Sequence, residues 1–465
     1  MNPLELTDIG NDTICAVSTP QGRGGIAVIR VSGPNTLDIV QRRWQGKSLA
    51  DMPSHTVHLG HLTDTTGDML DQMVLTVFRA PNSFTGEDVV ELACHGSTWI
   101  QQQVIQTLID AGCRHAAAGE FTRRAFANGR MDLSQAEAVA DVIEAQSRAA
   151  HHVAMSQMRG RYSDELKQLR DKLLHFVALI ELELDFSEED VTFADRSEVT
   201  TLAREIHNLI SRLADSYREG NAIRNGMPVA IVGQTNAGKS TLLNALLRDD
   251  RALVSDIHGT TRDTIEDTIV MGGTLFRFID TAGIRQSSDT VERMGIERTW
   301  QAINKASVVL WVVDVTSADT SMSSDILTRC EGKTLITVLN KTDLDDDIAA
   351  RSELNELLPE GTPVVAISAK SEKDIETLRK LIVETAALPN VDSDTVIVTN
   401  ARHYQALTRA RNAISRAIDG LNNGLSGDLL DQDIRECLHW LGEITGEITT
   451  DNILAEIFAH FCVGK

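Results

Sequence analysis

The chain has 465 residues, with 67 acidic and 44 basic side chains and a formal net charge of -23. This length favours about three domains, and the charge excludes a generally basic coat, so any RNA contact must be a local patch or be shared with a partner. The six cysteines are scattered without a Cys-x-x-Cys pair, which predicts neither a zinc site nor a disulfide framework.

Residues 1–125 mix expected strands and helices and predict an α+β domain. Short apolar runs predict four strands, and helical spacing predicts two helices. The strands are expected at 13–17, 26–31, 73–78 and 89–93, and the helices at 100–111 and 121–127. No stretch approaches ~20 apolar residues, and residues 1–12 lack the apolar core of a signal peptide. We therefore expect a soluble protein in the reducing cytoplasm.

Helical periodicity begins at Asp132 and continues with few breaks to residue 217. The acidic stretch 185–190 is expected to be a solvated turn between two helices, and Gly220 and Gly226 are expected to mark a joint. Helical spacing returns at 402–418, 429–445 and 449–461. This second helical segment is too short for a good core of its own. We therefore expect it to pack with the helices of 132–217, and the intervening segment to be an insertion.

A phosphate-binding loop is expected between an apolar strand at 228–232 and the helix that follows it. The sequence Gly233-Gln-Thr-Asn-Ala-Gly238-Lys239-Ser240 fits G-x-x-x-x-G-K-[ST] at every fixed position. Strand, glycine loop and helix form the context that this motif requires. Backbone N–H groups would surround a β-phosphate, Lys239 would reach the β- and γ-phosphates, and the Ser240 hydroxyl is placed for Mg²⁺.

Two motifs that sense the γ-phosphate follow in the expected order. The polar loop Gly259-Thr-Thr-Arg-Asp263 contains a threonine that can close over Mg²⁺. An expected strand at 276–280 ends in Asp280-Thr-Ala-Gly283, which provides an acid for the Mg²⁺ shell and a glycine near the γ-phosphate.

Two further motifs predict guanine selectivity. A β-rich run at 334–339 ends in Asn340-Lys-Thr-Asp343, and a strand at 363–367 precedes Ser368-Ala-Lys370. The Asp343 carboxylate can accept both N1–H and the 2-amino group of guanine, a donor pair that adenine lacks. Sites of this kind discriminate by ~10⁴ or more. The ordered motifs together resemble a translation-factor-type GTPase domain.

The residue that would orient the attacking water in a Ras-like GTPase is here Ile284, which cannot do so. Composition alone does not choose among the candidates in the following loop, which are Arg285, Gln286, Asp289, Glu292 and Arg293. Asn236 offers an amide that could ligate a monovalent cation beside the phosphates. K⁺ there would neutralise charge as an arginine finger does, an effect of ~10³–10⁵ in rate.

The whole chain resembles the bacterial MnmE (TrmE) family of tRNA-modification GTPases. The likeness covers residues 21–465 and is carried by Gln21-Gly-Arg-Gly-Gly-Ile-Ala-Val-Ile-Arg30, Pro81-Asn-Ser-Phe-Thr-Gly-Glu-Asp88, Gly119-Glu-Phe-Thr-Arg-Arg-Ala-Phe126, Asp132-Leu-Ser-Gln-Ala-Glu-Ala138, Thr399-Asn-Ala-Arg-His403 and Phe461-Cys-Val-Gly-Lys465. It implies a multi-domain α/β and α fold with an N-terminal folate-binding and dimerisation domain (1–125). A helical domain (126–217 and 389–465, ending in Cys-x-Gly-Lys) would follow, with a P-loop, Ras-like GTPase domain (218–388) inserted in it.

The resemblance also implies the activity. Family members hydrolyse GTP and use a 5-formyl- or 5,10-methylene-tetrahydrofolate. With the FAD-binding partner MnmG they install an aminomethyl-type group, such as carboxymethylaminomethyl, on C5 of the wobble uridine 34 of certain tRNAs. A homodimer, Mg²⁺ and K⁺ are implied as well. The net negative charge agrees with the partner carrying much of the grip on tRNA.

Site residues follow from the resemblance by position. The folate residues are Arg30, Glu87, Arg130 and Lys465, although some relatives have lysine in place of Arg130 and the two cations are not equivalent. The expected K⁺ ligands are Asn236, Ser255, Ile257 and Thr260, the Mg²⁺ ligands are Ser240 and Thr261, and the catalytic residues are Glu292 and Cys462. The expected GTP contacts are Asn236, Ala237, Gly238, Lys239, Ser240, Thr241, Ser255, Asp256, Ile257, His258, Gly259, Thr260, Thr261, Asp280, Thr281, Ala282, Gly283, Asn340, Lys341, Asp343, Ser368, Ala369 and Lys370.

The alternative is a GTP-timed molecular switch in ribosome or RNA assembly that carries out no one-carbon chemistry. The GTPase motifs fit both functions. Residues 1–125 and the Phe461–Lys465 segment favour the modification enzyme, because a simple switch does not need them.

Overall fold

The computed structural model describes residues 12–185, 196–248, 266–279, 292–317, 323–344, 357–386, 396–425 and 427–464. The chain divides into two compact units: unit 1 comprises residues 1–140, 157–208 and 409–465, and unit 2 comprises residues 141–156 and 209–408. The domain boundaries expected from the sequence stay predictions. Among the described helices, none combines the length and the apolar character that a membrane crossing requires.

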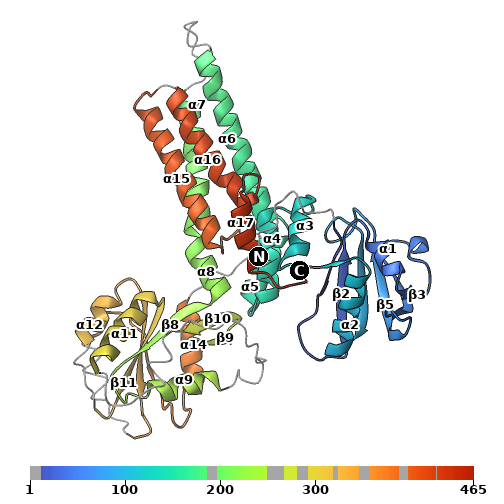
Figure 1. Ribbon diagram of the computed structural model, residues 1–465. Coiled ribbons are helices and arrows are strands. Elements are labelled where there is room, and N and C mark those ends of the chain that lie inside the picture. Colours follow the sequence, from blue (N-terminus) through green and yellow to red (C-terminus); the bar gives the residue numbers. More distant parts are fainter. Residues whose placement is uncertain are drawn as a thin grey trace. The chain divides into compact units, whose positions relative to one another are not determined.

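The N-terminal part of unit 1 is a seven-stranded sheet covered by helices (Figure 1). The strand order is β3-β4-β5-β6-β2-β1-β7, and β1 pairs antiparallel with β2 but parallel with β7. Helix α2 packs on β1, β2, β5 and β6. The elements are β1 (Ile14–Val17), β2 (Ile26–Ser32), α1 (Thr36–Gln41), β3 (Trp44–Gln45), η2 (Leu49–Asp51), β4 (Thr56–Thr63), β5 (Met69–Phe78), β6 (Val89–His95), α2 (Thr98–Asp110), β7 (Arg114–His115) and α3 (Glu120–Ala127).

All four strands and both helices expected in this region are confirmed, with small differences at their ends. The sequence did not predict β4, because His58 and His61 interrupt its apolar residues. The strand nevertheless forms, since both of its edges are paired, with β3 on one side and β5 on the other. The α+β character of this region is therefore confirmed.

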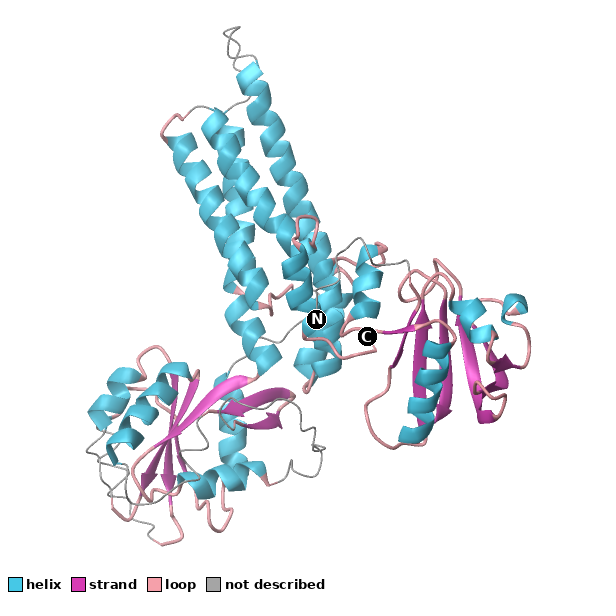
Figure 2. Ribbon diagram, viewed as in Figure 1, coloured by secondary structure: helices cyan, strands magenta, loops and turns pink. Residues whose placement is uncertain are grey.

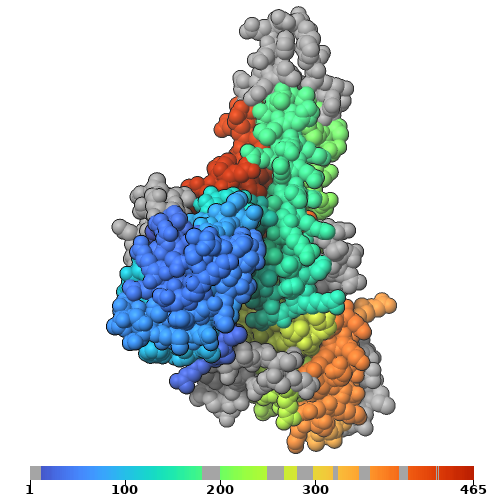
Figure 3. Space-filling model, turned by 90° about the vertical axis from the view of Figure 1, so that its right-hand side faces the viewer, coloured from blue at the N-terminus to red at the C-terminus, as the bar shows by residue number. Residues whose placement is uncertain are grey.

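Long helices form a separate group of elements between the N-terminal sheet and the sheet of unit 2 in the sequence, and again at the C-terminal end of the chain (Figure 2). Within unit 1, α16 packs along α6, and α6 buries Leu166, Leu169, Leu173, Phe176 and Ile180 at helical spacing. The outer face of α6 forms a continuous green surface in Figure 3. The helices are α4 (Leu133–Glu144), α5 (Arg148–Met158), α6 (Arg161–Asp185), α7 (Arg196–Asp215), α8 (Tyr217–Asn225), α15 (Ala401–Asn422), α16 (Gly427–Thr445) and α17 (Asp451–Ala459).

Unit 2 contains a six-stranded sheet with the order β13-β12-β11-β8-β10-β9, parallel except for the β9–β10 pair. One core joins α9 and α14 to the sheet, and a second core joins α11 and α12 to it, so helices cover both faces (Figure 1). This is a doubly wound α/β layout. Its elements are β8 (Met227–Val232), α9 (Lys239–Leu247), β9 (Asp267–Met271), β10 (Thr274–Phe278), α11 (Glu292–Lys305), β11 (Val308–Asp314), α12 (Ser323–Arg329), β12 (Thr334–Asn340), β13 (Val364–Ala366) and α14 (Ile375–Ala386).

Unit 2 differs from the sequence expectation at its central strand and at one glycine, among other positions. The central strand β11 was not predicted, although six of its seven residues are buried. Gly220 does not mark a joint but lies inside α8, where a Cβ atom would come within 2.1 Å of the Val398 carbonyl oxygen. Gly220 therefore allows α8 to lie close to the backbone at Val398. Gly226, with φ of 86°, does form the joint between α8 and β8.

Candidate functional site

The phosphate loop connects β8 to α9 in a conformation that depends on glycine. Gly233, Asn236 and Gly238 have φ values of 145°, 66° and 96°. A Cβ atom would lie 2.2 Å from the Val312 carbonyl oxygen at Gly233, and 2.2 Å from Asn340 Nδ2 at Gly238. The two glycines therefore let the loop lie against β11 and against the end of β12.

Lys239 is folded back onto this loop at the first position of α9. Its Nζ donates to the carbonyl oxygens of Gly233 (2.7 Å) and Gln234 (2.6 Å), and burial lowers its pKa. A buried ammonium group at a helix N-terminus that is wrapped by a glycine loop fits a polyphosphate. Ser240 follows in the same turn and presents the hydroxyl oxygen that Mg²⁺ accepts as a ligand.

Asn340 joins the phosphate loop to the two expected guanine motifs. Its Nδ2 donates to the Ala237 carbonyl oxygen (2.8 Å), and its Oδ1 accepts from the Ala369 N–H (3.0 Å). The residue is 2% exposed, so both bonds are shielded from water. The described structure thus brings 236–241, 340–343 and 368–370 to one edge of the sheet.

Asp343 faces this edge as an exposed carboxylate. Its Oδ1 accepts a hydrogen bond from Ser368 Oγ at 2.6 Å, and this bond lowers the pKa of Asp343. An ionised carboxylate held in one orientation can accept the paired donors of a purine edge. This geometry fits a guanine base.

Asp314 is a member of the site that sequence reasoning missed. It ends β11, and its Oδ2 lies 2.5 Å from Lys341 Nζ. Burial alone would raise the pKa of Asp314, but the hydrogen bonds from Lys341 and Thr316 lower it. The sequence does contain a signal for Asp314. It is an acidic residue directly after a run of six apolar residues, which is typical of the carboxyl end of a parallel strand, where ligands bind.

Several expected site residues lie outside the described part of the chain. Glu292 is the first residue of α11, but its side chain lies outside the described part of the chain. The other expected residues outside the described ranges are Ser255, Asp256, Ile257, His258, Gly259, Thr260, Thr261, Asp280, Thr281, Ala282, Gly283 and Lys465.

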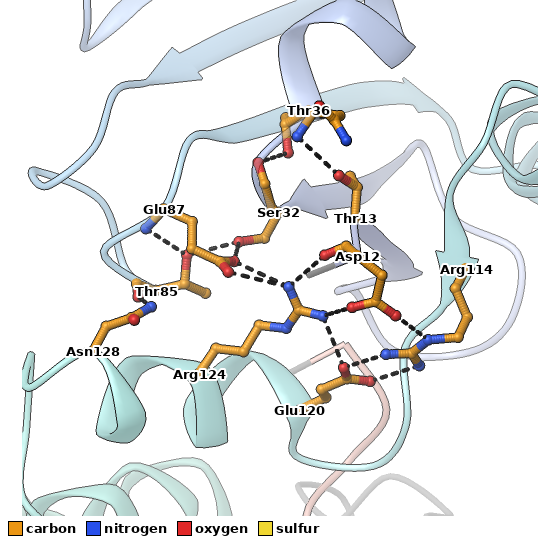
Figure 4. Close-up of polar contacts among 12 residues, drawn as sticks. Asp12, Thr13, Ser32, Thr36, Thr85, Glu87, Arg114, Glu120, Arg124 and Asn128 are labelled. Atoms are coloured by element: carbon orange, nitrogen blue, oxygen red, sulfur yellow. Dashed lines mark hydrogen bonds and ion pairs between the residues drawn. The ribbon is translucent and has the colours of Figure 1, made fainter. Parts of the chain in front are cut away.

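A second polar site lies in unit 1, in the loop between β5 and β6. The Oε2 atom of Glu87 accepts from Ser32 Oγ at 2.6 Å, and Oε1 accepts from Arg124 Nη1 at 3.1 Å (Figure 4). Arg124 is fully buried and also donates to the Asp12 carbonyl oxygen (2.8 Å) and to Asp12 Oδ1 (2.5 Å). Its Nη2 lies 3.1 Å from Glu120 Oε1. The guanidinium group therefore ties three carboxylates together.

Arg114 is the more exposed of the two arginines in the same cluster. It donates to Asp12 Oδ2 (2.6 Å) and to Glu120 Oε1 (2.5 Å) and Oε2 (3.0 Å). Burial alone would raise the pKa values of Asp12 and Glu120, but hydrogen bonds and charge from the two arginines lower both. Both carboxyl groups are therefore ionised near neutral pH.

The other two described folate candidates lie around the same loop. The Arg30 guanidinium donates twice to Glu91 Oε1 (3.0 and 2.8 Å) and lies 5.3 Å from the centre of the Phe84 ring. Arg130 lines a hollow of about 460 Å³ together with His55, Phe78, Asn82, Ser83 and Phe84. Gly86 lies against the Arg130 side chain, since a Cβ atom there would be 3.3 Å from Arg130 Cγ.

The segment 462–464 docks beside this domain, as its position after an apolar helix predicted. The Gly119 N–H donates to the Cys462 carbonyl oxygen (3.4 Å), Val463 bridges Ala118, and Ser18 Oγ donates to the Gly464 carbonyl oxygen (3.0 Å). Cys462 is exposed, whereas the other five cysteines are buried. This contact places an accessible thiol next to the start of α3.

Family models and curated relatives both match the chain. The model described as MnmE helical domain matches residues 133–462, and the model described as GTP-binding protein TrmE N-terminus matches residues 13–130. The chain is 54% identical to "tRNA modification GTPase MnmE" of Bacteroides thetaiotaomicron, over 98% of this chain and 100% of the relative. It is 53% identical to the protein of the same name from Parabacteroides distasonis, over 97% and 100%.

These matches agree with the geometry of unit 2. The phosphate and guanine motifs meet at the edge of the doubly wound sheet in unit 2, and the two family models together extend over nearly the whole chain. Since the helical-domain model alone matches more than half of the chain, the protein belongs to the MnmE family of tRNA modification GTPases.

Proposed function

We propose that this protein is a folate-dependent GTPase that modifies tRNA together with an FAD-containing, MnmG-type partner. The pair adds an aminomethyl or carboxymethylaminomethyl group to C5 of wobble uridine 34 in certain tRNAs. The protein acts in the cytoplasm as a homodimer. The observation that carries the proposal is the docking of the Cys462 segment onto the domain that also holds Glu87, because a GTP-timed switch needs no such thiol beside that domain.

The nucleotide part of the proposal concerns unit 2. The phosphate loop and Lys239 hold the phosphates, Asp343 accepts the guanine donors, and Ser240 and Thr261 hold Mg²⁺, which neutralises phosphate charge when bound. Asn236, Ser255, Ile257 and Thr260 hold K⁺. Glu292 orients the attacking water, since Ile284 cannot do so.

The cation proposal has a direct test. Asn236 is exposed and lies in the phosphate loop with φ of 66°. Changing Asn236 to Ala should abolish the stimulation of GTP hydrolysis by K⁺ while GDP binding is retained. A response to K⁺ that is unchanged in the variant would show that this amide is not a ligand.

The folate part concerns Arg30, Glu87, Arg130 and Lys465. The Glu87 carboxylate accepts N–H donors of the pterin ring, and Arg130 and Lys465 face the acidic tail. The hollow beside Arg130 supports this assignment, because it combines aromatic walls (Phe78 and Phe84) with a positive charge. Arg30 is already paired with Glu91, so we expect it to stack on the ligand rather than to neutralise its charge.

Cys462 is proposed to act in the modification step as a thiolate nucleophile. Lys465 provides the neighbouring positive charge.

Binding of 5-formyltetrahydrofolate to the purified protein tests the proposed function. Absorbance after equilibrium dialysis should show saturable binding that is lost in Glu87→Ala, while GTP hydrolysis continues in both proteins. Absence of folate binding, with normal GTP hydrolysis, would favour the assembly switch.

A further inference from the structure

We infer that Arg124 and Ser32 are positioning residues that fix the Glu87 carboxylate and thereby set the affinity of this domain for tetrahydrofolate. The inference rests on the folate role proposed above for Glu87. Neither residue was expected to belong to the site from the sequence. Their contacts with Glu87 are drawn in Figure 4.

Glu87 is held at both carboxylate oxygens. Ser32 Oγ donates to Oε2 at 2.6 Å, and Arg124 Nη1 lies 3.1 Å from Oε1 and 3.4 Å from Oε2. The side chain is 12% exposed, so it is largely withdrawn from water but still reaches the surface. A carboxylate has about four acceptor positions, and these contacts leave some of them for a ligand.

The backbone around Glu87 is fixed by the same group of side chains. Its N–H donates to Thr85 Oγ1 (3.3 Å), and its carbonyl oxygen accepts from Ser83 Oγ (2.6 Å). Asn128 Nδ2, just after α3, donates to the Thr85 carbonyl oxygen (2.7 Å). The loop therefore cannot turn the carboxylate away without breaking several bonds.

Arg124 is an unusually rigid anchor for this carboxylate. It is fully buried, and its other bonds go to Asp12 and Glu120. Arg114 also contacts Asp12 and Glu120, so these two acids have two guanidinium partners, whereas Glu87 relies on Arg124 and Ser32. Bridging three carboxylates needs the planar fork of a guanidinium group, which lysine does not offer.

The charges of the cluster also favour a donor-rich ligand. Asp12, Glu87 and Glu120 contribute three carboxylates, and Arg114 and Arg124 contribute two guanidinium groups. Among these five side chains alone, one negative charge is left in excess. We assign this negative charge to Glu87, because Glu87 contacts Arg124 but not Arg114, whereas Asp12 and Glu120 contact both arginines. A ring edge with adjacent N–H donors, as in a pterin, matches this charge.

Ser32 provides the milder of two perturbations. It is fully buried at the end of β2, where it pairs with Ile14 and Val89, so the sheet fixes its position. Ser32→Ala removes the bonds of this hydroxyl to Glu87 and to Thr85 Oγ1 and changes little volume. Arg124→Lys keeps the charge but loses the fork. Arg114→Gln is the matched control, because it removes an arginine from the same cluster without a contact to Glu87.

The experiment measures the Kd for 5-formyltetrahydrofolate, the rate of GTP hydrolysis and the midpoint of thermal unfolding for each full-length protein. Ser32→Ala should weaken folate binding on the order of tenfold, as the loss of one hydrogen bond to a charged group would. Arg124→Lys should weaken it further, and Arg114→Gln, which removes no bond to Glu87, should weaken it much less even where its unfolding midpoint falls. GTP hydrolysis should be the same in all of them.

A double-mutant comparison separates positioning from general stability. In a Glu87→Gln background, Ser32→Ala should have no further effect on folate affinity, because the group through which it acts is already altered. Additive losses would overturn the inference, as would unchanged affinity in Ser32→Ala with normal binding by the unaltered protein. Failure of the unaltered protein to bind folate would instead overturn the folate proposal, and this inference with it.

Discussion

Replacement of Gly464 by alanine tests whether the Cys462 segment is held by specific backbone contacts. Gly464 has φ of 97°, a backbone conformation that residues other than glycine rarely adopt. A Cβ atom there would lie 2.1 Å from the Val17 carbonyl oxygen. Because that neighbour is backbone in β1, it cannot move aside as a flexible side chain would. We therefore expect Gly464→Ala to release the segment from the domain.

The magnitudes favour release. The described segment is held by the bonds from Ser18 to Gly464 and from Gly119 to Cys462, each worth about 0.5–1.5 kcal/mol net. The left-handed backbone alone costs an alanine about 1–2 kcal/mol. The conformational cost therefore offsets most of what the two bonds contribute, before the contact with the Val17 oxygen is counted.

Hydrogen exchange at the Gly119 amide measures the outcome, because its acceptor is the Cys462 carbonyl oxygen. Exchange should be faster in Gly464→Ala than in the unaltered protein. Gly129→Ala is the matched control: Gly129 has φ of 68°, and no heavy atom lies within 4 Å of the place that an added Cβ atom would occupy, so the change carries the conformational cost without the contact. Equal protection of Gly119 in all three proteins would refute the reasoning.

Four further outcomes are expected. Asp343→Asn should shift nucleotide preference from GTP towards xanthosine triphosphate in a competition assay, and equal affinity of the unaltered protein for ATP and GTP would contradict the guanine assignment. Hydrolysis should be faster in K⁺ than in Na⁺, and Glu292→Ala should lower turnover without weakening GDP binding; equal rates in the two salts would exclude the cation role. Cys462→Ser should keep GTP hydrolysis but abolish the modified wobble uridine measured by mass spectrometry of cellular tRNA, whereas normal modification would show that the thiol is dispensable. The lowered pKa values of Asp12 and Glu120 stabilise the folded state above the ordinary carboxyl pKa of roughly 4. This stability is lost as the pH falls through the folded-state pKa values of the two groups. The midpoint of thermal unfolding should therefore drop in acid, and it should drop more steeply in the unaltered protein than in Arg114→Gln.

The parts of the fold that follow local rules were predictable from the sequence. The phosphate loop is recognised by the spacing of its glycines and lysine, and Asn340 and Asp343 follow a β-rich run. The helices of 133–185 were visible because their apolar residues recur at helical spacing. Each of these signals lies within a single stretch of chain.

The polar cluster of unit 1 could not be predicted in this way. Arg124 lies in a helix whose sequence reads as amphipathic, and its partners Asp12 and Glu87 are 112 and 37 positions away. Ser18 and Gly464 are separated by 446 positions. No local pattern encodes such pairs, because they arise only when the sheet and α3 have packed. Gly220 was misassigned for the same reason, since its contact is with Val398.

Stability alone is a poor explanation for Arg124. Withdrawing a guanidinium group and its carboxylate partners from water costs several kcal/mol per ion, and well-packed apolar residues often replace such clusters without loss of stability. An apolar residue at this position would, however, leave Glu87 without its cationic anchor. A requirement for one carboxylate in one orientation therefore accounts for the buried charge better than a requirement for stability does. The contrast with Arg114 supports this view, because Arg114 is 36% exposed and can interact with water, whereas Arg124 is 0% exposed and its described contacts are to protein oxygens.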